Sequence, residues 1–329
     1  MGVLNYVFCA VNELTDENIE QYVKLFNVTF PEPLSKQEFL DKFTRRMGTN
    51  AYFVFLRHET HGIVGSIGAI EVPYWFEGRQ YRFALTVDGM IASDHRSDWL
   101  ALKRMHDLLT TELERLGFVY LFTKPNNNSY LYLKKLIGLS DIGELTTYGF
   151  LLRPFRRLNR RLAWLDVPWM GLVKAIAWLC SRGTPVTETG PGRVHPLIDA
   201  ANAEIRRTRD AAFLNTRYGD ERYRWIECRG HIAIYTIRRY SGWSACFVLE
   251  ASQFGFRDWM AMLNYLLKRH GDIEVVLRIV GRPRTHLPLI RIPAFLLPNK
   301  FHVVGKSIGK TVLPQSAILA VDISDFEMV

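Results

Sequence analysis

The sequence predicts an α/β chain in which mixed sheets are covered by helices, and it divides the chain into two halves of similar design. Short stretches of alternating apolar residues are separated by segments with apolar residues at helical spacing, which is typical of sheets packed against helices. The order helix, hairpin, helix and strand occurs twice within 329 residues. That length is sufficient for two domains, each with its own core.

The chain begins with a predicted strand at 6–11 and two helices. Thr15 is expected to cap the first helix, whose first turn carries Asp16 and Glu17 near the positive end of the helix dipole. The segment 35–38, Ser-Lys-Gln-Glu, has the pattern of a capping box at the start of the second helix.

Three antiparallel strands are predicted next, at 51–57, 63–72 and 83–91. Turns at 58–62 and 77–78, each ending in glycine, join them into a meander.

An Asp-Gly pair interrupts the third of these strands. Glycine inside a strand often marks a β-bulge or the close approach of a ligand, so Asp88 and Gly89 predict a bulge. A bulge leaves a backbone N–H unpaired, and Met90 or Ile91 is expected to carry it. Asp88 is a candidate functional carboxylate; alternatively, it only bonds the backbone near Gly89.

A helix follows the meander, then a strand and a second helix. The polar turn 93–98 leads into a predicted helix from Trp99 to Leu116, which Gly117 ends. A strand at 119–123, an Asn-rich turn and a helix from Ser129 to Gly138 come next. Because N–H groups at the start of a helix favour anions, both helix starts are candidate anion sites.

This order resembles the core of the GNAT acyltransferase superfamily, in which the turn after the fourth strand holds the pyrophosphate of an acyl-coenzyme A. The family turn reads Arg/Gln-x-x-Gly-x-Gly/Ala. This chain lacks its central glycine and reads Arg96-Ser97-Asp98-Trp99-Leu100-Ala101. A later family signature, with an Asn, a small residue and a Tyr before Gly-Phe, is matched loosely, with one residue inserted, by Asn126, Ser129, Tyr132 and Gly138.

The resemblance implies acyl-coenzyme A as co-substrate and transfer of its acyl group to an amine. The unpaired N–H of Met90 or Ile91 is then expected to bind the thioester carbonyl, and Asp88 to accept a proton or to pair with a substrate ammonium. The histidines show no metal spacing, so no metal is expected.

The pyrophosphate contacts are expected at the helix start, from His95, Arg96, Ser97 and Trp99. Asn126 and Ser129 are expected at the pantetheine, with capping of the helix as the alternative for Asn126. Tyr132 is the candidate general acid, or else an aromatic of the core. Glu71 is a second candidate base.

The segment 154–192 is expected to connect a first domain, 1–153, to a second, 193–329. The first domain is expected to close with a strand at 144–153. An arginine cluster then precedes a Trp-rich apolar stretch. The stretch is interpreted as a connector helix packed between the domains, with an interfacial membrane helix as the alternative. It is expected to be too short, and too interrupted by Asp166, Pro168 and Lys174, to span a bilayer.

The second half repeats the pattern of the first without a polar anion turn, so it predicts a degenerate GNAT-like domain with no coenzyme of its own. Its helices are expected from 195 to about 210 and at 256–269. Its strands are expected at 231–238, 244–250, 273–280, 301–304 and 318–323.

The formal charge of +9 is compatible with nucleic acid, an anionic membrane or a polyphosphate ligand. The basic residues show no pattern of a nucleic-acid-binding motif, so nucleic acid is not expected as a partner. Four cysteines without a CxxC pair predict neither a zinc site nor a disulfide framework. No signal peptide is expected, and a reduced, cytoplasmic setting fits best.

Tandem GNAT chains whose second half opens with Phe-Leu-x-x-Arg-Tyr, here 213–218, resemble bacterial N-acyltransferases that acylate nucleotide-linked amino sugars for surface polysaccharides. This resemblance implies transfer of an acetyl or 3-hydroxyacyl group from acyl-coenzyme A to a sugar amine. A homo-oligomer is one option for the assembly. The alternatives are a GNAT enzyme acting on another small amine and a peripheral membrane protein that uses residues 153–182.

Overall fold

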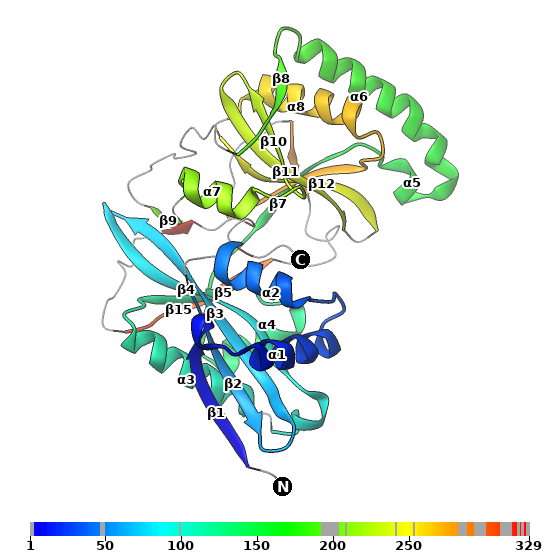
Figure 1. The fold of residues 1–329 in the computed structure, drawn as a ribbon. Coiled ribbons are helices and arrows are strands. Elements are labelled where there is room, and N and C mark those ends of the chain that lie inside the picture. Colours follow the sequence, from blue (N-terminus) through cyan, green and yellow to red (C-terminus); the bar gives the residue numbers. More distant parts are fainter. Residues whose placement is uncertain are drawn as a thin grey trace.

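The computed structural model describes residues 3–46, 50–98, 100–191, 204–207, 209–240, 242–252, 254–281, 288–292, 301–309, 318–320, 323 and 326. They form two mixed sheets, one in each half of the molecule, with helices packed on them (Figure 1). The predicted α/β class is confirmed.

The first sheet contains the predicted meander. Its order is β1 (Leu4–Ala10), β2 (Ala51–His58), β3 (Gly62–Phe76), β4 (Arg79–Ile91), β5 (Tyr120–Thr123), β15 (His302–Ser307) and β6 (Ser140–Glu144). At one end, β3 also pairs with β9 (Glu204–Arg207), which pairs with β16 (Ile318–Ala320). Its helices are α1 (Asp16–Thr29) and α2 (Lys36–Asp41) on one face, and α3 (Ala101–Arg115) and α4 (Asn127–Lys135) on the other.

The second sheet has the order β14 (Ile290–Arg291), β7 (Thr146–Leu151), β13 (Val275–Val280), β12 (Trp243–Ala251), β11 (His231–Tyr240), β10 (Arg224–Cys228) and β8 (Val186–Thr189). The helices of this half are α5 (Phe155–Leu158), α6 (Asp166–Cys180), α7 (Ala211–Tyr218) and α8 (Phe256–Arg269). Short helical turns complete the described part: η1 (Val11–Glu13), η2 (Lys42–Arg46), η3 (Ser93–His95) and η4 (Arg160–Leu165).

Helices α1 and α2 begin at the capping residues that the sequence predicts. The side chain of Thr15 accepts from the N–H of Asn18, and Ser35 and Glu38 form the predicted capping box. Both interactions satisfy N–H groups that a helix start leaves without partners.

The second sheet repeats the design of the first, as predicted. In each sheet a parallel strand pair is joined by a crossover helix: β4, α3 and β5 in the first, β12, α8 and β13 in the second. The pairing of β12 with β11 contains a β-bulge: Val248 pairs with Tyr235 and Glu250 pairs with Ile234, which leaves one extra residue on β12. The second half is therefore a second copy of the same architecture, bulge included.

The two halves exchange strands. β7, from the first half of the sequence, pairs with β13, whereas β15, from the second half, lies between β5 and β6. The expectation that 144–153 closes the first domain is therefore wrong, as is the assignment of 301–304 to the second. The chain passes from one sheet to the other at Leu145, whose N–H donates to the carbonyl of Phe301. An alternating strand pattern does not specify the partner strand, so local sequence could not predict this exchange.

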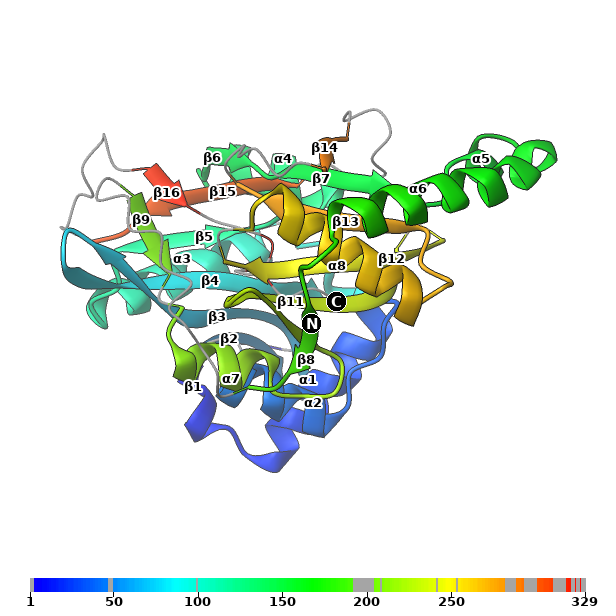
Figure 2. The same ribbon diagram turned by 90° about the horizontal axis from the view of Figure 1, so that it is seen from above.

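Two helix predictions also need correction. Residues 204–207 form strand β9, not the end of a helix, while 192–203 lie outside the described residues. Helix α6 does not pack between the halves: it lies on α8 at the outer face of the second sheet (Figure 2). The connector interpretation of its packing is therefore wrong.

The facing sides of the two sheets share one hydrophobic core. Phe53, Phe83 and Phe122 from the first sheet and Trp225 and Phe247 from the second belong to the same buried cluster. Burying large aromatic side chains supplies much of the stability of such a core. The two halves are therefore expected to unfold together.

Acid should destabilise the protein through His106 on α3. Its imidazole is 1% exposed, and burial, with Lys306 nearby, lowers its pKa to about 3. The unfolded chain takes up this proton near pH 6.5, whereas the folded chain does not until about pH 3. Below pH 6.5 the wild type should therefore lose about 1.4 kcal/mol more per pH unit than His106→Gln does. Urea unfolding at several pH values measures this difference, and parallel curves for the two proteins would contradict it.

Candidate functional site

The predicted bulge in β4 is present. Ser66 pairs with Met90 and Gly68 pairs with Val87, so Asp88 and Gly89 together face the one residue between them on β3. Asp88 adopts a φ of 52°, in the left-handed region that aspartate enters more readily than most residues other than glycine. The Asp-Gly pair thus marks the position where the ladder changes register.

Strands β4 and β5 separate just before this bulge. They pair only from Phe83 to Leu85 on β4 and from Tyr120 to Phe122 on β5. The hydroxyl of Thr123 then donates to the carbonyl of Thr86 at 2.8 Å. Beyond that bond, no described strand pairs with the β5 side of β4, so the end of β4 presents backbone groups there.

Backbone direction distinguishes the two candidate amides. The N–H of Ala92 donates to Val64 on β3 at 2.8 Å. Neighbouring residues of a strand point their backbone groups to opposite sides, so Met90 also faces β3, whereas Ile91 faces away from it. The carbonyl of Ile91 accepts from Arg96 Nε at 2.9 Å, in agreement with this direction. Ile91 is therefore the better candidate, while the side chain of Met90 is buried in the shared core.

The carboxylate of Asp88 is held by two buried partners. Tyr22 Oη on α1 and Lys42 Nζ in η2 each donate to Asp88 Oδ2 at 2.7 Å. The Lys42 side chain is 5% exposed and that of Asp88 is 13% exposed. Because Tyr22 and Lys42 both donate to this carboxylate beside the bulge, the geometry favours a positioning role for Asp88. Local sequence did not indicate Tyr22 or Lys42, since both partners are distant in sequence from Asp88.

Glu71, the second candidate base, belongs to a structural ion pair. Arg82 donates to its two oxygens at 2.7 and 2.9 Å, and Asn50 donates at 2.9 Å. Burial alone would raise the pKa of Glu71, but the bonds from Arg82 and Asn50 outweigh burial and lower it. The structure therefore gives no support to Glu71 as a base.

The turn between β4 and α3 is exposed at Arg96 and Ser97, as a site for an anion requires. Trp99 lies outside the described residues. The carboxylate of Asp98 accepts from the N–H of Leu100 at 3.1 Å and from Arg104 at 2.8 Å. A phosphate at this helix start would thus have Asp98 as a neighbour, with its charge balanced by Arg104.

His95 joins two histidines of the β2–β3 hairpin. The rings of His58 and His61 stack with centroids 4.4 Å apart, and the His95 ring lies 5.2 and 5.8 Å from them. Partial desolvation, together with the neighbouring rings, lowers the pKa of His58. Within the described ranges, no group of three or more His, Cys, Asp or Glu side chains is placed to hold a metal.

The start of α4 is closed by its own side chains. Asn126 Oδ1 accepts from the N–H of Ser129 at 2.8 Å, and Ser129 Oγ donates to the carbonyl of Asn126 at 3.3 Å. The structure therefore shows the capping alternative for Asn126. Contacts of either residue with pantetheine remain a prediction.

Tyr132, on α4, packs against the core beneath α3. Its hydroxyl is buried and has no hydrogen-bond partner among the described residues. Burial, with Asp107 on α3 adding to it, raises the pKa of Tyr132 to about 12. The phenol is thus protonated at neutral pH, as a proton donor must be.

Sequence reasoning did not identify Lys124 as a candidate. It directly follows β5, where β4 and β5 have separated, and its ammonium lies 5.5 Å from the ring of Phe301. Burial lowers the pKa of Lys124. The sequence could have indicated Lys124, because a lysine between an apolar strand and Pro125 lies at the carboxyl end of that strand.

Solved structures share this arrangement over nearly the whole chain. A GCN5-related N-acetyltransferase from Kribbella flavida is similar with a TM-score of 0.62 and 13% identity, over 92% of this chain and 71% of that one. Another from Anabaena variabilis has a TM-score of 0.60 and 10% identity, over 92% and 72% of the chains. Eis1 from Mycobacterium abscessus has a TM-score of 0.54 and 10% identity, over 93% and 73%. The chain has the GNAT fold. No protein-family profile and no curated protein sequence matches it.

In the second GNAT-like half, the chain's own carboxylate occupies the start of the crossover helix. Asp258 on α8 is 1% exposed and accepts from the N–H of Gly255 at 2.9 Å and from Arg229 at 2.8 Å. Cys228 Sγ also donates to it, at 3.4 Å. The N–H of Gly255 is thus already bonded by a carboxylate of the chain itself, which supports the prediction that this half binds no coenzyme.

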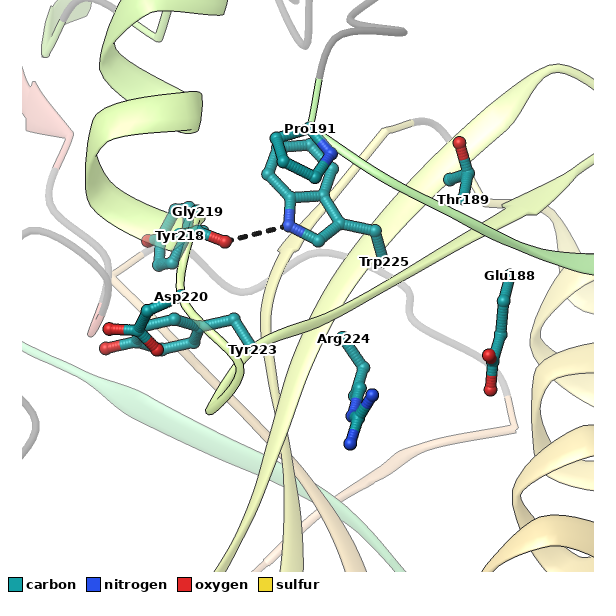
Figure 3. Close-up of a pocket in the computed structure, with 9 residues that line it drawn as sticks. All are labelled: Glu188, Thr189, Pro191, Tyr218, Gly219, Asp220, Tyr223, Arg224 and Trp225. Carbon is teal, nitrogen blue, oxygen red and sulfur yellow. Dashed lines mark hydrogen bonds between the residues drawn. The ribbon is translucent and has the colours of Figure 1, made fainter.

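A pocket of about 110 Å³ lies elsewhere in the second half, between β8, β10 and the end of α7 (Figure 3). Trp225 Nε1 donates to the carbonyl of Tyr218 at its wall, at 2.9 Å. The pocket is lined by Glu188, Thr189, Pro191, Tyr218, Gly219, Asp220, Tyr223, Arg224 and Trp225. None of these is a predicted site residue, and the volume is too small for a coenzyme.

Replacing Asp88 by Asn should destabilise the fold, because it removes the carboxylate that pairs with buried Lys42. Removing one partner of such a pair costs about 3–5 kcal/mol, and Lys42→Met should cost a similar amount. The double variant should recover much of the loss, because neither charge remains. Urea unfolding of the four proteins measures this coupling.

The same variants test Asp88 as the base. An Asp88→Asn protein as stable as wild type, but with turnover lowered about 10²–10⁴-fold, would contradict the positioning role and identify a proton acceptor.

Proposed function

We propose that this protein is an acyl-coenzyme A-dependent N-acyltransferase that works at the end of β4 in the first half. The observation that carries the proposal is the bulge at Asp88, which turns the N–H of Ile91 to the side from which β5 has separated. A pantetheine chain that added to this edge would bring its thioester carbonyl to Ile91. The pyrophosphate would lie at the turn that carries Arg96, at the start of α3.

The chemistry follows from these groups. The acceptor amine attacks the thioester carbonyl, and the Ile91 N–H stabilises the negative charge that develops on the carbonyl oxygen. The carbon–sulfur bond then breaks, and the coenzyme leaves as a thiolate. Tyr132, protonated at neutral pH, is the proposed donor to that thiolate. Since Asp88 is paired with Lys42, we propose that the amine proton passes through the substrate to water and that water then returns a proton to the Tyr132 phenolate. Asp88 holds the bulge in place.

We propose the amine of a nucleotide-linked amino sugar as acceptor, in a cytoplasmic step of surface polysaccharide synthesis, with an acetyl or 3-hydroxyacyl group transferred. The tandem layout and the Phe-Leu-x-x-Arg-Tyr segment at 213–218 support this class. The net charge of +9 also suits a ligand that carries phosphates. Another small amine is the alternative acceptor.

Acetyl-coenzyme A should bind with a stoichiometry of one per chain. Arg96→Ala should weaken binding about tenfold, because an exposed arginine contributes a charge-assisted contact of modest strength. Isothermal titration calorimetry measures both quantities. Arg115→Ala, at an exposed arginine on the far end of α3, is the matched control and should bind like wild type. Two sites per chain, or no binding, would contradict the proposal.

Tyr132→Phe should lower turnover by about 10²-fold or more and leave coenzyme affinity nearly unchanged, because it removes only the proton donor. Since this hydroxyl makes no hydrogen bond to a described residue, its loss should not destabilise the fold. Steady-state kinetics with an amino-sugar nucleotide, combined with thermal unfolding, test both statements. An unchanged turnover would exclude Tyr132 as the acid.

A further inference from the structure

Helix α6 and the turn η4 before it present an apolar surface to solvent. The helix extends along the outside of the second half (Figure 2). The large exposed apolar side chains are Leu162 (37% exposed) and Trp164 (67%) in η4, and Val167 (75%), Leu172 (52%), Ile176 (44%), Trp178 (53%) and Leu179 (62%) in α6. Soluble proteins rarely expose so many large apolar side chains together, and those that do so generally bind another surface there.

The opposite face holds the helix to the protein. Val173 and Ala177 are buried in the cluster formed with α8 and the second sheet. Asp166, 6% exposed, accepts from the N–H groups of Phe155 and Arg156 and so fixes the start of α6. The helix therefore has a docked face, and its exposed apolar face is not part of the core.

The exposed charged side chains of the segment 153–182 all have the same sign. Residues 153–182 contain seven arginines and lysines against one acid, Asp166, which gives 7 − 1 = +6. Because Asp166 is buried, the exposed charges of the segment are basic, at Arg160, Arg161, Lys174 and Arg182. An apolar, Trp-containing face bordered by basic side chains is the composition of helices that lie in a membrane interface.

We propose that α6 and η4 bind the protein to an anionic phospholipid bilayer. The tryptophan and aliphatic side chains would enter the boundary between headgroups and acyl chains, and the basic side chains would contact lipid phosphates. A second copy of this chain fits less well, since a two-fold contact would place two segments of +6 beside each other. Charge complementarity thus favours lipid over self-association.

The helix lies in the plane of the bilayer and does not cross it. The segment Arg160–Cys180, 21 residues with a mean hydropathy of 1.3, is long and apolar enough to span by length and composition. Crossing would require Val173 and Ala177 to leave the core of the second half, and it would carry Asp166 and Lys174 into hydrocarbon. The docked face therefore keeps the helix at the surface.

Vesicle flotation of the full-length protein tests this proposal. Wild type should float with vesicles of phosphatidylcholine and phosphatidylglycerol, float less with phosphatidylcholine alone, and float less as salt increases. Arg160→Gln with Arg161→Gln should weaken partitioning about 25-fold, from about fivefold for each basic side chain near an anionic surface. Leu172→Gln with Trp178→Gln should weaken it at least about tenfold.

The controls use exposed residues elsewhere on the protein. Val28→Gln, at a residue 74% exposed on α1, and Arg115→Gln, with a side chain 73% exposed on α3, should float like wild type. Circular dichroism establishes that each variant is folded. The proposal would be overturned if the wild type stayed in the bottom fraction while the anionic vesicles floated. A dimer in solution that Leu172→Gln with Trp178→Gln dissociates, without vesicle binding, would overturn it in favour of self-association.

Discussion

The exchange of β7 and β15 between the two sheets is the constraint on which the rest of the structure depends. Each parallel pair, β4 with β5 and β12 with β13, is completed by a strand that comes from the other half of the sequence. Strand β5, which separates from β4, is paired along its other edge with β15, a strand from the second half of the sequence. The candidate site is thus a property of the whole chain, although the predicted site residues all belong to the first half.

Features set by neighbouring residues could be predicted from the sequence. Thr15, Ser35 and Asn126 cap helices through bonds to N–H groups three residues away, and the Asp88–Gly89 pair forms a bulge in its own strand. Strand partners and the ion pair of Asp88 with Lys42 could not be predicted, because both join segments that sequence spacing does not relate.

The two halves use the same architecture but differ at the start of the crossover helix. In the first half, Arg96 and Ser97 are exposed before α3, and Asp98 is balanced by Arg104. In the second half, Asp258 is buried and bonded by Gly255 and Arg229, so the anion position is satisfied from within. This intramolecular replacement distinguishes the half that carries the candidate site from the other half, which contributes strand β15 and part of the shared core.

The position of α6 has a geometric consequence for access to the first half. The helix lies on the outer face of the second sheet, and the first half lies on the opposite side of that sheet (Figure 1). Because the two sheets share one core, the halves keep a fixed relative orientation. A molecule resting on α6 would hold the end of β4 in the aqueous phase, separated from the surface by the thickness of the second half. Such a molecule would meet acceptors diffusing in water, and an amine anchored within the bilayer would lie out of its reach.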